Sequence, residues 1–385
     1  MWLSITPAGP PKGAAKPPLP ETPRPETPPT ETLPIETVRA IAILVLVSFH
    51  VIGGDGAEAG RGLGITYPHP LRFYADLLVD IRMPLFAFIA GVVYALKPVE
   101  PAQLGRFLIG KARRLALPGI TAITVFMLMA AAMGSREGAI ISHPWDAYLH
   151  HYAIFWFLQV MLLIFVSYGT LDILTRGRVL LPALALAMLA LGFGWRFDAT
   201  FLALNRYTHL MAYFLLGVAF CRYLPLLRRH RALVLGLALA ALVAGLAMNL
   251  MVLRQTGAFS GERLDLQSLL FGCGICVAAF LMLPSLPWLS WLGAYSLTIY
   301  LYHILFTSTT RRLLLAAGIE APWLNVLMGT AIGVGMPILL HLLANRYRLS
   351  RLMVLGLRDR DAARRRQPAG AGTPLAAWPA PRAAA

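Results

Sequence analysis

Two polar residues, Arg39 and His50, stand in an apolar stretch near the start of the sequence, VRAIAILVLVSFHVIGG. Their spacing is close to three helical turns, so a helix would carry both side chains on one face, about 16 Å apart along its axis. Histidine suits proton transfer near neutral pH. The pair therefore indicates acid–base chemistry. The structural alternative is a core histidine bonded to a carbonyl, with Arg39 extending towards lipid headgroups.

The next apolar stretch, LRFYADLLVDIRMPLFAFIAGVVYAL, contains Asp76, Asp80 and Arg82 ahead of Pro84. An ionisable group inside a membrane span costs about 2.5–3.5 kcal/mol, so its presence needs a reason. Positions 80 and 82 point to different sides of a helix and do not form a simple intrahelical ion pair. Counted along antiparallel spans, both lie at a depth similar to that of His50. We expect Asp80 to orient the His50 ring and Arg82 to face an anionic or polarised group; a structural charge network is the alternative.

Further polar and aromatic side chains in later apolar stretches fit a substrate-binding role. Ser296, Tyr300 and His303 recur at helical spacing and share a face. Trp156 opens another apolar stretch, and His209 lies near one end of a further one. Hydrogen bonds between helices and an interfacial aromatic belt are the structural alternatives.

The elements that carry these residues are membrane-spanning helices. Of the 385 residues, 58% are hydrophobic and 14% are charged, whereas soluble domains have about 25% charged residues. A helix needs about 20 apolar residues to cross a bilayer. The sequence predicts an all-α polytopic membrane protein with about ten spans: 37–54, 71–96, 115–134, 152–173, 179–197, 206–225, 231–253, 265–285, 290–317 and 322–346. The second and ninth are long enough to tilt or break, and Pro84 makes a kink in the second plausible.

Two tails flank the expected membrane domain, 37–350. Residues 1–36 are rich in proline and residues 351–385 are basic and then rich in proline and alanine, so we expect both to be disordered. Lysine and arginine concentrate in alternate loops, which predicts that both termini are cytoplasmic. The net charge of +16 is spread over loops and tail and does not form the patch that nucleic-acid binding requires.

The three cysteines do not indicate a metal or redox centre. Cys273 and Cys276 form a CxxC inside an apolar run, without the second pair of ligands that structural zinc needs. We interpret them as small residues at a helix contact. The common nucleotide-binding, serine hydrolase and metalloprotease motifs are not found.

Four stretches in this order resemble the acyltransferase family 3 membrane proteins. They are the Arg39-to-His50 pattern, DIRMPLFAFIAGVVYAL, HYAIFWFLQVMLLIF and GAYSLTIYLYHILF. Together they extend over about residues 37–346. The second stretch is similar to the glucan- and sugar-acylating branches of the family.

The resemblance implies a ten-helix enzyme of the bacterial cytoplasmic membrane. Such an enzyme takes an acyl group, usually acetyl, from acyl-CoA and places it on a hydroxyl of a carbohydrate or another envelope molecule. The resemblance makes His50 the catalytic residue and Arg39 its companion. Lys111, Arg113 and Arg114 loosely match a basic cluster of the family that would bind the donor. No metal is implied.

These considerations give a working mechanism. His50 acts as general base or acyl relay with Asp80 orienting it, and Arg82 stabilises negative charge on the acyl oxygen. Arg39 and the basic cluster attract the CoA phosphates. Trp156, His209, Tyr300 and His303 contact the acceptor. Two other classes stay open: a transporter or flippase of a small anion or lipid-linked sugar, and a membrane partner without turnover. The oligomeric state is not predicted.

Overall fold

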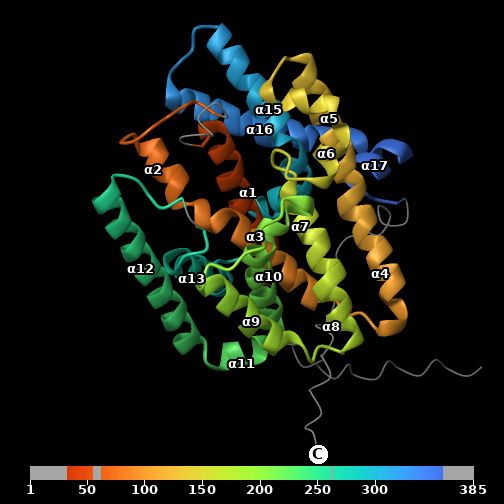
Figure 1. Cartoon of the computed structure of the whole chain (residues 1–385), viewed down its shortest axis with the longest axis vertical. Helices are drawn as coiled ribbons and strands as arrows, with labels where there is room; N and C mark the ends of the chain where they lie inside the picture. The colour runs from red at the N-terminus through yellow and green to blue at the C-terminus, as the bar shows by residue number, and fades with distance from the viewer. Residues whose placement is uncertain (1–32, 55–61, 262, 359–385) are drawn as a thin grey trace, which may run out of the picture. The chain divides into compact units, whose positions relative to one another are not determined.

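The apolar runs of the sequence form helices in the computed structural model, which describes residues 33–54, 62–261 and 263–358. These residues contain helices and no β-strand (Figure 1). The α-helices are α1 (Ile35–Ile52), α2 (Pro70–Leu77), α3 (Val79–Ala95), α4 (Leu104–Lys111), α5 (Leu117–Ala132), α6 (Pro144–Leu149), α7 (Trp156–Ile164), α8 (Thr170–Leu174), α9 (Leu180–Gly192), α10 (Tyr207–Arg222), α11 (Leu224–Arg229), α12 (Arg231–Thr256), α13 (Leu266–Met282), α14 (Pro287–Gly293), α15 (Ser296–Ala316), α16 (Pro322–Ala344) and α17 (Arg348–Leu355).

The all-helical prediction is confirmed for the described residues, but the count of about ten spans is not. Six helical segments are long and apolar enough to cross a membrane, and a seventh is added if α14 and α15 form one bent span. The remaining expected spans correspond to α9, α10 and α13, which have 13, 16 and 17 residues. Helices of this length fall short of the roughly 20 residues that a bilayer of normal thickness requires.

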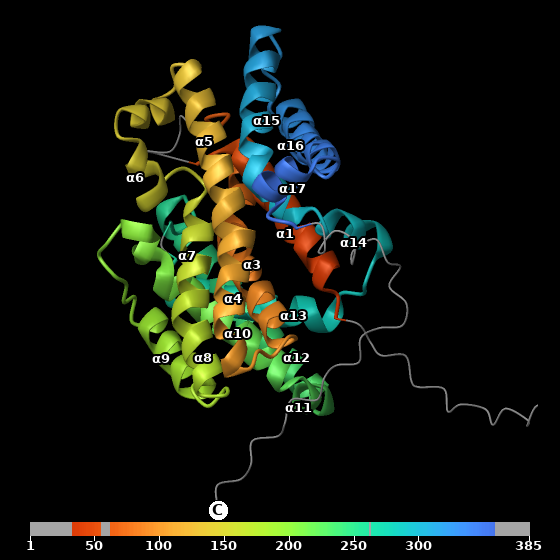
Figure 2. The ribbon, with the colours of Figure 1, turned by 90° about the vertical axis from the view of Figure 1, so that its right-hand side faces the viewer.

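Two of the expected spans are interrupted. The second is divided at Leu78 into α2 and α3, while Pro84 lies within α3 and does not end it. The ninth is divided between α14 and α15, whose axes differ in direction by 69° (Figure 2). The bend between α14 and α15 re-aims the helix that carries Tyr300 and His303. The break at Leu78 leaves Pro70–Ala95 as one candidate span, in which α3 carries Arg82.

Glycine allows α3 and α10 to touch along their backbones. A Cβ atom on Gly91 of α3 would lie 2.0 Å from the Phe214 carbonyl oxygen, and one on Gly217 of α10 would lie 2.1 Å from that of Phe88. Such reciprocal contacts between small residues are typical of helix packing in membranes. The same principle joins α12 and α13, where Gly274 faces Ala238 and Leu242. The interpretation of the CxxC as a helix contact agrees with this, since Gly274 lies between its two cysteines.

Helix α1 occupies a central position in this arrangement. It packs against α3, α14, α15 and α16 (Figure 2), and most of its apolar residues are buried. Gly293 of α14 lies close to the Glu36 carbonyl, which fixes the first turn of α1. At the other end, the fully buried Arg72 bonds the Gly53 carbonyl and pairs with Asp76. The helix that contains His50 is therefore held at both ends.

The expected terminal tails lie mostly outside the described residues. Residues 1–32 and 359–385 are not described. Helix α1 begins at Ile35, and α17 continues to Leu355, across the boundary expected at residue 351.

Candidate active site

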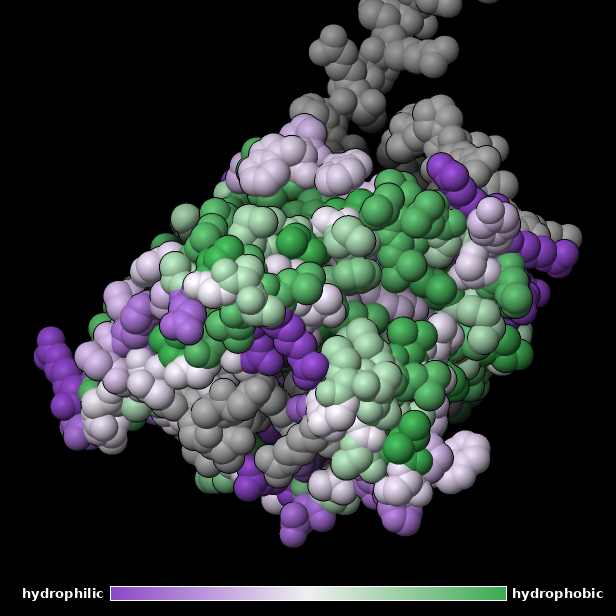
Figure 3. Space-filling model, turned by 90° about the horizontal axis from the view of Figure 1, so that it is seen from above, coloured by the Kyte–Doolittle hydropathy of each residue, from purple (hydrophilic) through white to green (hydrophobic). Residues whose placement is uncertain are grey.

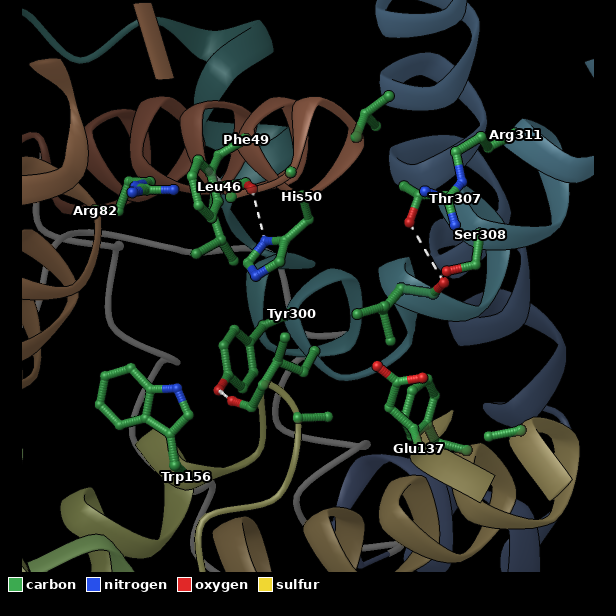
Figure 4. A pocket seen from close by; sticks show the side chains of 18 of the residues that line it. Leu46, Phe49, His50, Arg82, Glu137, Trp156, Tyr300, Thr307, Ser308 and Arg311 are labelled. Atoms are coloured by element: carbon green, nitrogen blue, oxygen red, sulfur yellow. Dashed lines mark hydrogen bonds between the residues drawn. The ribbon is translucent and has the colours of Figure 1, made fainter. Parts of the chain in front are cut away.

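A cavity of about 190 Å³ opens beside the last turn of α1. We call it the His50 cavity. Its volume is many times the roughly 10–15 Å³ that one water molecule needs, so it has room for part of a substrate. Elements far apart in the sequence surround it, including α1, α3, α5 and α15 (Figure 4). Its polar and aromatic lining includes His50, Arg82, Ser135, Glu137, His151, Trp156, Arg206, Arg263, Tyr300, Thr307, Ser308, Arg311 and Arg312.

The His50 ring points into this cavity with one nitrogen already engaged. Its Nδ1 lies 2.9 Å from the Leu46 carbonyl oxygen, one turn earlier on α1 (Figure 4). A carbonyl oxygen only accepts hydrogen bonds, so Nδ1 must carry the proton. In the neutral ring the lone pair is then on Nε2. The helix itself therefore fixes the tautomer that a general base or nucleophile requires.

This geometry corrects the expected role of Asp80. The sequence suggested that Asp80 holds the His50 ring, but the Leu46 carbonyl occupies the nitrogen that a carboxylate would bond. Asp80 is buried in α3, does not line the cavity and is hydrogen-bonded by the Ser268 side chain. It also interacts electrostatically with Arg263 and Arg82. Asp80 thus belongs to the support of the site.

Arg82 does line the His50 cavity, in agreement with the depth estimate from the sequence. Arg82 is only 4% exposed, and its guanidinium carbon lies 3.3 Å from the centre of the Phe49 ring. No carboxylate among the described residues forms an ion pair with it. The aromatic face offsets part of the cost of burying the charge and leaves N–H donors for a ligand.

Of the other residues expected at the site, some line the His50 cavity and some do not. Trp156 and Tyr300 line the His50 cavity, and the Tyr300 hydroxyl donates to the Ile154 carbonyl oxygen (Figure 4). His303 is fully buried and does not line it; its ring centre lies 5.0 Å from that of His50. His303 Nδ1 lies 2.9 Å from the carbonyl oxygens of Ile299 and Tyr300. His303 therefore packs behind the His50 ring and does not face the cavity.

The residues expected to bind the donor lie elsewhere. Arg39 is near the opposite end of α1, where it bonds both carboxylate oxygens of Glu36 at 2.6 and 2.8 Å. Lys111 lies with its Nζ 3.5 Å from the centre of the Phe165 ring. Arg113 and Arg114 follow in a π-helical turn, Ala112–Ala116, that leads into α5. None of the four lines the His50 cavity.

Sequence reasoning missed four arginines of this cavity. Arg206, Arg263, Arg311 and Arg312 line it together with Arg82, against one acidic residue, Glu137. Arg206 and Arg263 lie at or beyond the ends of the apolar stretches, where a charge needs no functional reason. Arg311 and Arg312 form a pair near the end of an otherwise apolar span, and that pair was the available signal. Low-dielectric walls focus the field of such charges, so the cavity attracts anions.

The face of the molecule seen from above in Figure 1 carries hydrophilic side chains among hydrophobic ones. A strongly hydrophilic group lies near the middle of this face, between two hydrophobic areas, and other hydrophilic side chains lie at its edges (Figure 3). Among the described residues, no group of three or more histidine, cysteine, aspartate or glutamate side chains has the geometry to hold a metal ion.

His50 has a fixed tautomer and lies in a cationic cavity among apolar helices. This arrangement suits a membrane protein that transfers a proton or a chemical group. Comparison with known families makes this specific. Residues 34–342 match the acyltransferase domain of acyltransferase family 3, and the chain belongs to this family. The protein is thus an acyltransferase. Neither the curated proteins nor the solved structures contain a significant match.

Proposed function

We propose that the protein moves an acyl group, usually acetyl, from acyl-CoA to a hydroxyl of a carbohydrate or another molecule of the bacterial cell envelope. The observation that carries this proposal is the free lone pair of His50 Nε2, which follows from the bond between Nδ1 and Leu46 inside an arginine-lined cavity. The family membership supplies acyl transfer as the reaction.

In the proposed reaction His50 Nε2 takes the proton from the acceptor hydroxyl. The hydroxyl oxygen attacks the thioester carbonyl and forms a tetrahedral intermediate. Arg82, which lines the cavity, stabilises the negative charge on its oxygen, as a positioned cationic donor does. The intermediate collapses, the C–S bond breaks, and His50 returns the proton to the CoA thiolate. The products are an acyl ester and free CoA, and His50 is again neutral.

The separation between the two expected sites suits a long donor. Arg39 and His50 are about 16 Å apart along α1. A donor with phosphates near Arg39, Lys111, Arg113 and Arg114 must extend a narrow arm to bring its reactive carbon to His50. Acyl-CoA has this form, with phosphates at one end and the thioester at the other. We place the phosphate end and both chain termini on the cytoplasmic side and the His50 cavity nearer the outer side, where envelope acceptors are found.

The test uses purified protein, radiolabelled acetyl-CoA and a cell-envelope extract. We expect label to enter a glycan fraction, and His50→Ala to lower the rate at least about 100-fold, because general-base catalysis contributes about 10²–10⁴. His230→Ala is the matched control, since His230 is exposed and lines no described cavity.

Transfer by His50→Ala at nearly the wild-type rate would disprove the proposed mechanism. Uptake of a substrate into proteoliposomes without any transfer of label would instead support the transporter.

A further inference from the structure

A second cavity, of about 210 Å³, adjoins the His50 cavity and shares two arginines with it. We call it the Arg196 cavity. Its polar lining consists of Arg196, Asn205, Arg206, His209 and Arg263. Arg206 and Arg263 also line the His50 cavity. A molecule that fills the second cavity therefore reaches the edge of the first.

The Arg196 cavity is more one-sided in charge than the His50 cavity. Three arginines line it, and no aspartate or glutamate of the described chain does so. Asp80 interacts with Arg263 from outside the lining. Arginine presents a planar fork of N–H donors that matches phosphate and carboxylate oxygens. The side chains thus favour an oxyanion.

Two of the residues that line this cavity each have a buried polar atom without a hydrogen-bond partner among the described residues. His209 is only 4% exposed, and its Nε2 is unpartnered. The Asn205 Oδ1 is buried and unpartnered as well. Leaving a buried polar group unsatisfied costs about 1–3 kcal/mol. A ligand with both an oxyanion and a neighbouring hydroxyl would satisfy such a pair.

The backbone that presents these residues is strained. Leu202 and Ala203 have φ angles of 47° and 54°, in the left-handed region that residues with a Cβ atom rarely adopt. Each such residue costs about 1–3 kcal/mol and persists where the surrounding structure requires it. Leu202 and Ala203 lie in a short 3-10 helix, Phe201–Arg206, that ends with Asn205 and Arg206 just before α10. The fold thus holds Asn205 and Arg206 in place at a cost in backbone strain.

We infer that the Arg196 cavity binds an acidic group of the acceptor, a phosphate or a carboxylate, while the hydroxyl to be acylated lies at His50. The inference rests on the proposed function and narrows the acceptor to an anionic sugar. Arg206 connects the two cavities, because its guanidinium lies 5.7 Å from the ring of Trp156, which lines the His50 cavity. A sugar beside Trp156 thus extends towards His50 in one direction and towards the three arginines in the other.

Binding of simple anions tests this inference without turnover. Purified full-length protein in an uncharged detergent is titrated with inorganic diphosphate and, separately, with a uronic acid disaccharide, and the heat of binding is measured. We expect binding that weakens as salt is added. Arg206→Gln and Arg263→Gln should each raise the Kd about tenfold or more, because a hydrogen bond to a charged group is lost.

The control is Arg254→Gln, because Arg254 is exposed at the end of α12 and lines neither cavity. Tighter binding of diphosphate would identify a phosphate-linked acceptor, and tighter binding of the uronate a carboxylated glycan. The inference is overturned if neither anion binds, or if the two cavity variants bind both anions as wild type does. His50→Ala should still bind the anions, so a failure of the proposed catalysis and a failure of this site are distinguishable.

Turnover provides a second measurement. Arg196→Gln should raise the KM for the acceptor about tenfold and leave the KM for acyl-CoA unchanged, because Arg196 lines the Arg196 cavity and not the His50 cavity. A rise in the KM for acyl-CoA alone would assign the cavity to the donor and overturn the inference.

Discussion

Two arginines whose side chains expose little surface, Arg222 and Arg82, show contrasting ways of holding a cation inside this protein. Arg222 makes two bonds to Asp172, at 2.9 and 2.6 Å, and Tyr94 and Tyr168 donate to the same carboxylate. Arg82 lies over the Phe49 ring and faces the His50 cavity. A carboxylate uses the donors of an arginine, whereas an aromatic face leaves them available. The first arrangement joins helices, and the second suits a ligand.

The largest expected effect is a loss of protein stability when the paired arginine, Arg222, is replaced. Arg222→Met should lower the free energy of unfolding by about 3–5 kcal/mol, because it leaves Asp172 buried without its counter-ion. Thermal unfolding in detergent measures this loss. The double variant Asp172→Leu/Arg222→Met should recover much of the stability, since a buried pair replaced by apolar residues is often neutral. If Arg222→Met melts as wild type does, the pair does not hold these helices together.

The variant Arg82→Gln should affect activity more than stability. We expect the rate of acyl transfer to fall about 10²–10³-fold, the usual cost of removing one donor to a developing oxyanion. Its unfolding transition should shift less than that of Arg222→Met, because no ion pair among the described residues is broken. Single-turnover transfer and thermal unfolding of the same preparation give both values. A variant that unfolds early and keeps its rate would make Arg82 a structural residue like Arg222.

The smallest effect belongs to Arg39, which is paired but partly exposed. Its ion pair with Glu36 involves side chains that are 22% and 40% exposed, so we expect Arg39→Gln to change stability by about 1 kcal/mol or less. If Arg39 contacts the donor, the KM for acyl-CoA should rise while the KM for the acceptor stays constant. Glu36→Gln is the matched control, because it removes the pair and keeps the arginine. Equal kinetics for the two variants would argue against a donor-binding role.

The helices and the family could be predicted from the sequence because both depend on local signals. Apolar runs identify helices, and the four short stretches around Arg39, Pro84, Trp156 and His303 carry the family resemblance. The span count was harder, because α9 and α13 are apolar but short and α14 turns away from α15. Hydropathy reports where a chain is apolar and does not report where a helix stops.

The site was harder to predict than the fold, for a physical reason. A depth count along two helices was enough to place His50 and Arg82 beside the same cavity. It could not show that the Leu46 carbonyl, and not Asp80, holds the imidazole, because that bond depends on the side-chain rotamer. Arg206 precedes α10 and Arg263 follows α12, so only the folded chain brings them to one cavity.

The glycine contacts between α3 and α10 have a consequence for how this protein can move. Carbonyl oxygens occupy the space of the missing side chains at Gly91 and Gly217, so neither helix can slide along the other without its backbone atoms clashing. Arg82 is on one of them and His209 on the other. We therefore expect the distance between the two cavities to change little when a ligand binds. An acceptor would be selected by the length between its acidic group and its reactive hydroxyl, and a sugar hydroxyl at the wrong distance would stay unmodified.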